Sequence, residues 1–88
     1  MTGPRKRLGF VGIIVDQREK CSEEVNRILS EHASLILART GLPHAMGNVS
    51  VITLVINATT DETGILTGKL GRIEGVSVKS GLAKKQTP

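Results

Sequence analysis

Two stretches of this chain are apolar on both faces when they are read as β-strands. Successive side chains of a strand point to opposite faces of a sheet, so each strand carries two alternating sets. In residues 7–15 and 49–58 both sets consist largely of apolar residues or glycine. Strands of this composition need cover on both sides. We therefore expect both stretches in the centre of a sheet, flanked by more polar strands.

Two helical patterns follow these strands. The first covers residues 18–32, directly after Asp16, which can cap it. Its apolar residues have the spacing of one buried stripe and are Cys21, Val25, Ile28 and Leu29. The second helix begins after Thr59, because Thr59 and Glu62 have the spacing of a capping box. Its buried side is expected to carry Ile65, Leu66, Leu70 and Ile73.

Two further strands complete the pattern. Residues 34–39 form a short apolar run, and residues 40–48 contain Gly41, Pro43 and Gly47 and predict a turn-rich connection to the strand at 49–58. Together these segments predict a hairpin. In residues 76–80, Val76 and Val78 alternate with polar residues, which is typical of an edge strand.

The order strand, helix, strand, strand, helix, strand predicts an α+β fold of the ferredoxin-like βαββαβ type. With right-handed crossovers it gives a four-stranded antiparallel sheet with both helices on one face and the spatial order fourth, first, third, second. We expect a single domain over residues 7–82, with residues 1–6 and 83–88 as flexible tails.

Helices on one face leave the other face of two apolar strands uncovered. That exposed area is larger than a monomer usually tolerates, and a chain of 88 residues buries only a modest core. The single cysteine excludes an internal disulfide. We therefore expect a homo-oligomer, with a twofold dimer first and a tetramer as the alternative.

Charge is concentrated at the ends of the chain. The formal net charge is +4, but Arg5, Lys6, Arg7, Lys84 and Lys85 supply five of the twelve cations. Residues 8–83 then hold seven cations against eight acids. DNA binding through the basic tails therefore stays open as an alternative. No long apolar segment begins the chain, which favours a cytoplasmic protein without membrane contact.

Two other functions of the βαββαβ topology fit poorly. RNA-recognition modules stack bases on aromatic residues of the central strands, and Phe10 is the only aromatic residue here. Acylphosphatases hold a phosphate in a backbone cradle after the first strand, but here Asp16 would repel an anion and no glycine opens the turn. We predict that the chain is not an enzyme.

Two stretches resemble a known family. They are Val15-Asp16-Gln17-Arg18-Glu19-Lys20 and Gly68-Lys69-Leu70-Gly71-Arg72-Ile73-Glu74-Gly75-Val76-Ser77-Val78-Lys79. Both resemble the iron-only hydrogenase system regulators, which are small ACT-like proteins similar in fold to the C-terminal domain of the nickel-responsive repressor. The resemblance implies a regulatory role without catalysis, through sensing of a small-molecule effector or contact with a protein partner of the hydrogenase system. The alternative is an assembly protein that docks onto a partner without a small ligand.

The nickel site of that repressor is not carried over. It would need several histidines and a cysteine close together, and this chain offers only Cys21, His32 and His44. Cys21 falls on the apolar stripe of the first helix and His32 at its end, so packing and a helix C-terminal role are expected. We predict no metal and no cofactor.

The resemblance also points to candidate ligand contacts. In ACT domains, small regulatory ligands often lie near the first strand-to-helix turn, which here places Asp16 and Arg18 as the candidates. The predicted topology gathers charged residues from three connections at that end of the sheet: Asp16, Arg18, Arg39, His44, Arg72 and Glu74. The competing interpretation is a solvated rim in which Asp16 only caps the helix.

Overall fold

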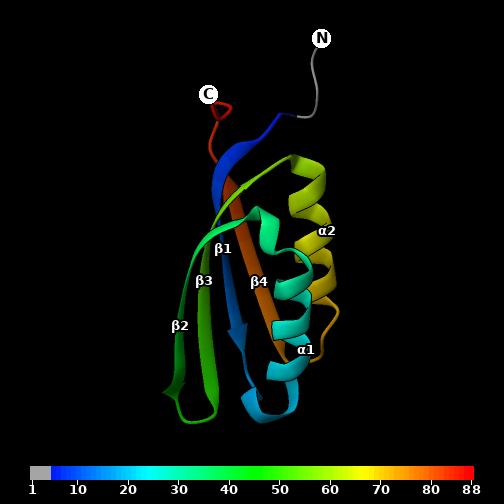
Figure 1. The fold of residues 1–88 in the computed structure, drawn as a ribbon. Helices are drawn as coiled ribbons and strands as arrows, with labels where there is room; N and C mark the ends of the chain where they lie inside the picture. Colours follow the sequence, from blue (N-terminus) through cyan, green and yellow to red (C-terminus); the bar gives the residue numbers. More distant parts are fainter. Residues whose placement is uncertain (1–4) are drawn as a thin grey trace.

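The computed structural model describes residues 5–88, apart from the side chains of Arg18 and Glu19. Residues 1–4 of the predicted N-terminal tail lie outside this description. The elements in chain order are β1 (Arg7–Val15), α1 (Arg18–Glu31), the short 3-10 helix η1 (Ala33–Leu35), β2 (Ile36–Met46), β3 (Val49–Ala58), α2 (Thr60–Gly71) and β4 (Val76–Leu82) (Figure 1).

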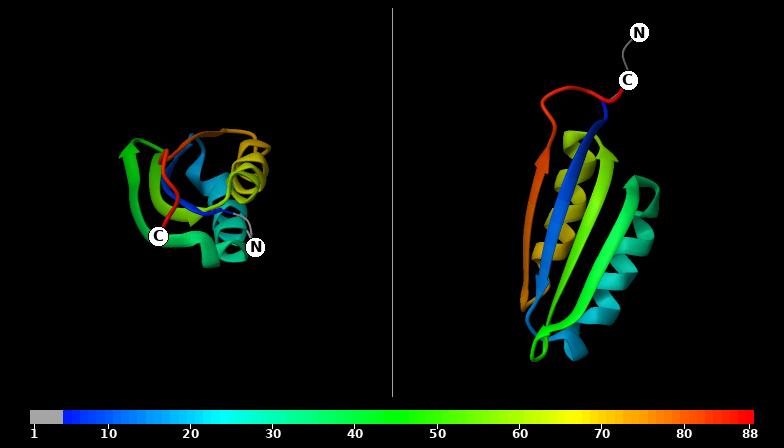
Figure 2. Two further views of the ribbon diagram at one scale, coloured as in Figure 1. Left: turned by 90° about the horizontal axis from the view of Figure 1, so that it is seen from above. Right: turned by 90° about the vertical axis from the view of Figure 1, so that its left-hand side faces the viewer.

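The four strands form one antiparallel sheet in the order β2-β3-β1-β4, so β1 and β3 are its central strands. Both helices cover the same face, and the other face is bare (Figure 2). The predicted α+β fold of the ferredoxin-like βαββαβ type is confirmed, with its strand order and its two central strands.

The core lies between the sheet and the helices. The central strands contribute Val11, Ile13 and Val15 from β1 and Leu54, Ile56 and Ala58 from β3. Helix α1 contributes its predicted stripe of Cys21, Val25, Ile28 and Leu29, and α2 with the turn after it contributes Leu66, Leu70 and Ile73. The prediction that Ile65 lies on the buried side is wrong, because Ile65 points away from the sheet and is 53% exposed. Full burial of one such aliphatic side chain is worth about 1.5–3 kcal/mol. The helices therefore pack against the odd-numbered side chains of β1 and the even-numbered side chains of β3.

The second strand is longer than predicted. The segment 40–48 was expected to be a turn-rich connection, but β2 continues to Met46 and only Gly47 and Asn48 form the turn. Pro43 is tolerated because β2 is an edge strand and because residues 43–45 have no partner in the register with β3, so the missing N–H costs no ladder bond. The pairing with β3 shifts register between Leu42 and Met46, as at a β-bulge. Gly47, at φ +61, supplies the left-handed backbone that a two-residue hairpin turn requires.

Helix α2 begins at the predicted capping box. The Thr59 hydroxyl accepts a hydrogen bond from the Glu62 backbone N–H (3.0 Å), and the Glu62 carboxylate accepts one from the Thr59 backbone N–H (2.8 Å). The latter bond, with help from Lys6 at 3.2 Å, holds the pKa of the Glu62 carboxyl below its ordinary value. The ionised carboxylate is therefore favoured in the folded chain.

Beyond β4 the backbone stays close to the first strand. The N–H of Ala83 donates to the carbonyl of Leu8 (2.7 Å), and that of Thr87 donates to the carbonyl of Lys6 (2.8 Å). The domain limits at residues 7 and 82 and the flexible tails stay predictions. None of the helices in the described part of the chain is long and apolar enough to cross a membrane.

Neighbouring residues of α2 test the core assignment. Leu66 is fully buried, whereas Ile65 beside it is 53% exposed. We expect Leu66→Ala to lower the free energy of unfolding by about 2–5 kcal/mol, because it leaves a cavity. The control Ile65→Ala should change it by less than about 0.5 kcal/mol. Urea denaturation measures both, and equal losses would contradict the packing of α2 on the sheet.

The capping box makes a prediction about pH. The folded-state pKa of Glu62 is depressed, so its charge stabilises the fold above the unfolded pKa of about 4.3. That contribution is lost as pH falls through the folded pKa. We therefore expect Glu62→Gln to be less stable than the parent chain at pH 7 and closer to it in stability near pH 3. Denaturation curves at both values measure this, with Glu23→Gln on exposed α1 as control. A penalty that persists at low pH would show that the charge is not its source.

Candidate functional site

The uncovered face of the sheet is apolar. Residues directly opposite one another in an antiparallel pair point to the same face, and the register therefore assigns its members. We call this surface the open face. It comprises Leu8, Phe10, Gly12 and Ile14 of β1, Val49, Val51, Thr53, Val55 and Asn57 of β3, Ala38, Thr40, Leu42 and Met46 of β2, and Ser77, Lys79 and Gly81 of β4.

Large and small side chains alternate in rows across the open face. One row across the sheet runs Leu42, Val51, Ile14, and another runs Ala38, Val55, Phe10. Between them lies a row of small residues, Thr40, Thr53 and Gly12. Leu42 and Phe10 are 60% and 54% exposed, and Ile14 and Val55 are each 44% exposed. Two apolar rows therefore stand on either side of a smaller one.

Phe10 extends this apolar surface over the edge strand. A Cβ atom added to Gly81 of β4 would lie only 2.7 Å from the Phe10 ring, so the missing side chain makes room for the ring. Lys79, opposite Gly12, is the one charged side chain on this face among the described strand residues. Charge is thus confined to one border of the open face.

The predicted gathering of connections at one end of the sheet is found for the backbone. The β1–α1 turn and the α2–β4 turn touch, because the N–H of Asp16 donates to the carbonyl of Gly75 (2.8 Å) and the thiol of Cys21 lies 3.2 Å from the carbonyl of Glu74. The β2–β3 hairpin reaches the same end (Figure 1). The three connections therefore lie at one end of the sheet, as expected.

Of the two candidate ligand contacts, the structure describes the side chain of Asp16 but not that of Arg18. Asp16 is exposed, but the prediction that it caps α1 is wrong, since the N-cap is Gln17 and no side chain caps this helix end. Arg18 is the first residue of α1, and its side chain lies outside the described part of the chain. Their proposed ligand role stays a prediction.

Arg39 and His44 are not part of one cluster. His44 lies near the hairpin tip, with Nδ1 at 3.1 Å from the carbonyl oxygen of Gly47. Arg39 lies opposite Leu54 in the body of β2 and reaches to α1, where its Nη2 donates to the Asn26 Oδ1 at 2.5 Å. The extension of β2 beyond Arg39 explains why the prediction placed Arg39 too close to the end.

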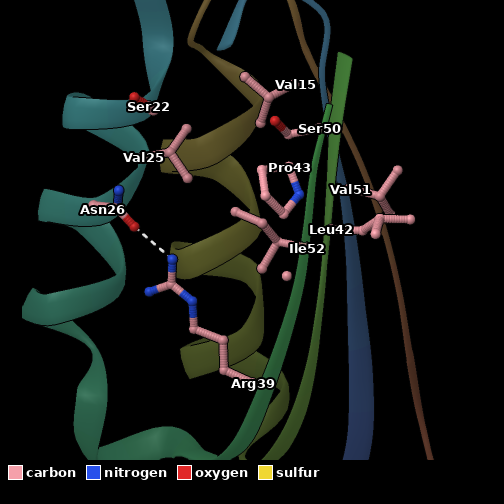
Figure 3. A pocket seen from close by; sticks show the side chains of 11 residues that line it. Val15, Ser22, Val25, Asn26, Arg39, Leu42, Pro43, Ser50, Val51 and Ile52 are labelled. Atoms are coloured by element: carbon pink, nitrogen blue, oxygen red, sulfur yellow. Dashed lines mark hydrogen bonds between the residues drawn. The ribbon is translucent and has the colours of Figure 1, made fainter. Parts of the chain in front are cut away.

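A cleft of about 140 Å³ lies between α1 and the β2–β3 hairpin, on the covered side of the sheet (Figure 3). Its lining includes Ser22 and Asn26 of α1, Arg39 of β2 and Ser50 of β3. The sequence reasoning did not find it. The one available signal was Ser50, a lone hydroxyl in the alternating set that also holds Ile52, Leu54 and Ile56.

Cys21 packs in the core as predicted, and His32 forms the C-cap of α1 with its ring 3.2 Å from the Lys69 ammonium. Within residues 5–88, no group of three or more histidine, cysteine, aspartate or glutamate side chains is placed to hold a metal ion. The site residues of this chain are therefore to be sought among the open face, the connecting turns and the cleft.

The fold defines the class of protein. The ACT domain from GTP pyrophosphokinase of Chlorobium tepidum has a TM-score of 0.73 and 18% identity, over 85% of this chain and 97% of that domain. The apo form of CPII from Thiomonas intermedia, a nitrogen regulatory PII-like protein, has a TM-score of 0.58 and 13% identity, over 94% of this chain and 99% of CPII. The chain therefore has an ACT-like fold.

The family is more specific. A model of the TM1266-like family, described as "Iron-only hydrogenase system regulator, putative", matches residues 7–80. The uncharacterized protein TM1266 from Thermotoga maritima is 40% identical, over 90% of this chain and 99% of its own, with a TM-score of 0.84. The chain belongs to this family, as the two quoted stretches indicated. No curated protein matches it.

Proposed function

We propose that this chain is a non-catalytic regulatory protein of the iron-only hydrogenase system and that it works as a homodimer whose subunits meet through the open face. Membership of the regulator family supports the first part. The open face supports the proposed homodimer, because its apolar rows are exposed in the single chain. Burying them against a second copy removes that surface from water.

The size of the open face supports a dimer. At ordinary strand spacing and rise, a sheet of four strands that are each eight residues long measures about 19 by 27 Å, or about 500 Å². Two copies would therefore bury about 1,000 Å² in total, the lower limit for a specific interface. Side-chain relief raises this figure further, since the accessible area of a ridged surface exceeds its projected area.

The chemistry of the open face favours a second copy over a charged partner. A twofold interface brings a surface against itself, so charge in its centre would repel. Here Lys79 lies at the β4 border, and the central rows are uncharged. The two large rows and the smaller row between them also give each copy both a ridge and a depression to pack with. A partner protein of the hydrogenase system would then bind elsewhere.

The effector of this regulator is proposed to contact Asp16 and Arg18. Exposure of Asp16 supports this, as does the bond that fixes its backbone to Gly75 across the neighbouring turn. A side chain on a fixed backbone loses less freedom when it binds. The alternative is an assembly protein that binds a partner protein and has no small-molecule effector.

Solution mass tests the dimer. At micromolar concentration we expect a species of twice the 9.4 kDa chain mass. Val55→Lys should yield the single chain, because it buries a charge in the centre of the open face. The matched control is Ile65→Lys on α2, where Ile65 is 53% exposed against 44% for Val55, and it should leave the dimer intact. Light scattering with circular dichroism measures mass and folding together. A folded parent chain of single mass, or a dimer unaffected by Val55→Lys, refutes the proposed interface.

Thermal-shift screening tests the effector contacts. The parent chain is heated with amino acids, nucleotides and divalent metal ions, since a ligand of the folded state raises the melting temperature by mass action. We expect a compound that stabilises the parent chain but not Asp16→Ala or Arg18→Ala. Glu23→Ala is the control and should keep the shift. If no compound stabilises the parent chain, the docking alternative is favoured.

A further inference from the structure

The cleft between α1 and the β2–β3 hairpin is separate from both the open face and the Asp16 turn. Figure 3 shows the side chains of Val15, Ser50 and Ile52 pointing into it, while Val51 points to the other side of the sheet. Its volume of about 140 Å³ is close to that of engineered cavities of about 150 Å³ that bind benzene. It is large enough for a small organic molecule.

Ser50 indicates that the cleft is built for a polar group. The residue is only 5% exposed, and among the described residues its Oγ is the one buried side-chain oxygen or nitrogen without a hydrogen-bond partner. A buried hydroxyl without a partner is costly, and native structures almost always satisfy it. The Ser50 oxygen faces the cleft (Figure 3), so the missing partner belongs there.

Arg39 supplies a positive charge at the other end of the cleft. Its Nη2 is held by the Asn26 amide oxygen at 2.5 Å, which orients the guanidinium toward α1. That bond uses one of five N–H donors. Among the described side chains Arg39 has no acidic partner, whereas Arg27 nearby on α1 pairs with Glu24 and Glu31. The remaining donors of Arg39 suit a planar carboxylate.

The walls between these two polar ends are apolar. Val15, Val25, Pro43 and Ile52 line the cleft from four different elements or turns. No described lining residue is acidic, so among these residues a ligand ammonium group would find no counter-charge and would meet the Arg39 charge. Ser50 lies four residues along β3 from Leu54, the strand neighbour of Arg39, which is about 13 Å. The long Arg39 side chain shortens that gap.

We propose that this cleft binds a small organic carboxylate of about four to six carbons that carries a hydroxyl or keto oxygen toward its other end. The carboxylate is held by Arg39 and Asn26, the carbon chain packs against Val25 and Ile52, and the second oxygen bonds to Ser50. The inference goes beyond the proposed function, because the cleft would be a second ligand site of the regulator, apart from the effector contacts proposed at Asp16 and Arg18. It assigns a ligand to the cleft and predicts the chemistry of that ligand.

A series of five-carbon probes tests the chemistry on the full-length chain. The probe 4-oxopentanoate has the carboxylate and the keto oxygen, pentanoate lacks the keto oxygen, and L-norvaline adds an ammonium group. We expect calorimetric titration to show binding of 4-oxopentanoate that is at least about tenfold tighter than that of pentanoate, with no binding of L-norvaline. Absence of 4-oxopentanoate binding at about 10 mM, or equal binding of L-norvaline, overturns the inference.

Two variants locate the binding. Arg39→Gln should weaken 4-oxopentanoate by about tenfold or more, since hydrogen bonds to charged groups are the stronger ones. The control Arg27→Gln removes a neighbouring charge outside the cleft and should change nothing. Ser50→Ala should bring the affinities of 4-oxopentanoate and pentanoate together. Because the Ser50 hydroxyl has no partner in the chain, this variant should fold with at least the stability of the parent chain.

The outcome is separable from that of the dimer. The mass of the chain is measured on the same samples. A dimer that does not bind 4-oxopentanoate overturns the cleft assignment alone. A single chain that does bind it overturns the dimer alone. A crystal structure grown with 4-oxopentanoate gives a direct reading. Density for the probe between Arg39 and Ser50 supports the inference, and a water molecule as the only partner of Ser50 overturns it.

Discussion

The antiparallel pairing of β1 with β3 is the constraint on which the rest of the structure depends. It runs without interruption from the Arg7–Ala58 pair to the Val15–Ser50 pair. Each strand carries an apolar set on each side, so the pairing creates two apolar surfaces back to back. The helices cover one of them and leave the other as the open face. A slip of one residue in either strand would exchange core and surface positions.

The fold could be predicted because its signals are local and agree with one another. Period-two strands, period-3.6 helices and the right-handed crossover lead to a single topology. The phase of β1 could not be predicted. Both Phe10 and Val11 belong to apolar sets, and which set faces the helices depends on how Val25 and Leu66 pack, which is tertiary information. The same holds for β3.

The site was predicted less well, for physical reasons that differ between residues. The cap of α2 has two reciprocal partners, Thr59 and Glu62, and was recognised. Asp16 had no such partner, and α1 begins without a side-chain cap. The edge position of β2 allows Pro43 within a strand, so the segment expected to be a turn extends the strand to Met46. Arg39 therefore lies in the middle of β2 and not at the end of the sheet. The lone hydroxyl of Ser50 acquires meaning only when its surroundings are known.

Strand β3 links the two proposed sites. Ser50 and Ile52 face the cleft, while Val51 between them lies in the open face. A ligand that orders this part of β3 would also order a side chain in the proposed dimer contact, and dimerisation would in turn order the cleft. Such coupling is reciprocal by thermodynamic necessity, and its size equals the difference in ligand affinity between single chain and dimer. A sheet only one strand thick would thus offer a short physical route from the cleft ligand to the dimer contact, without any hinge or domain movement.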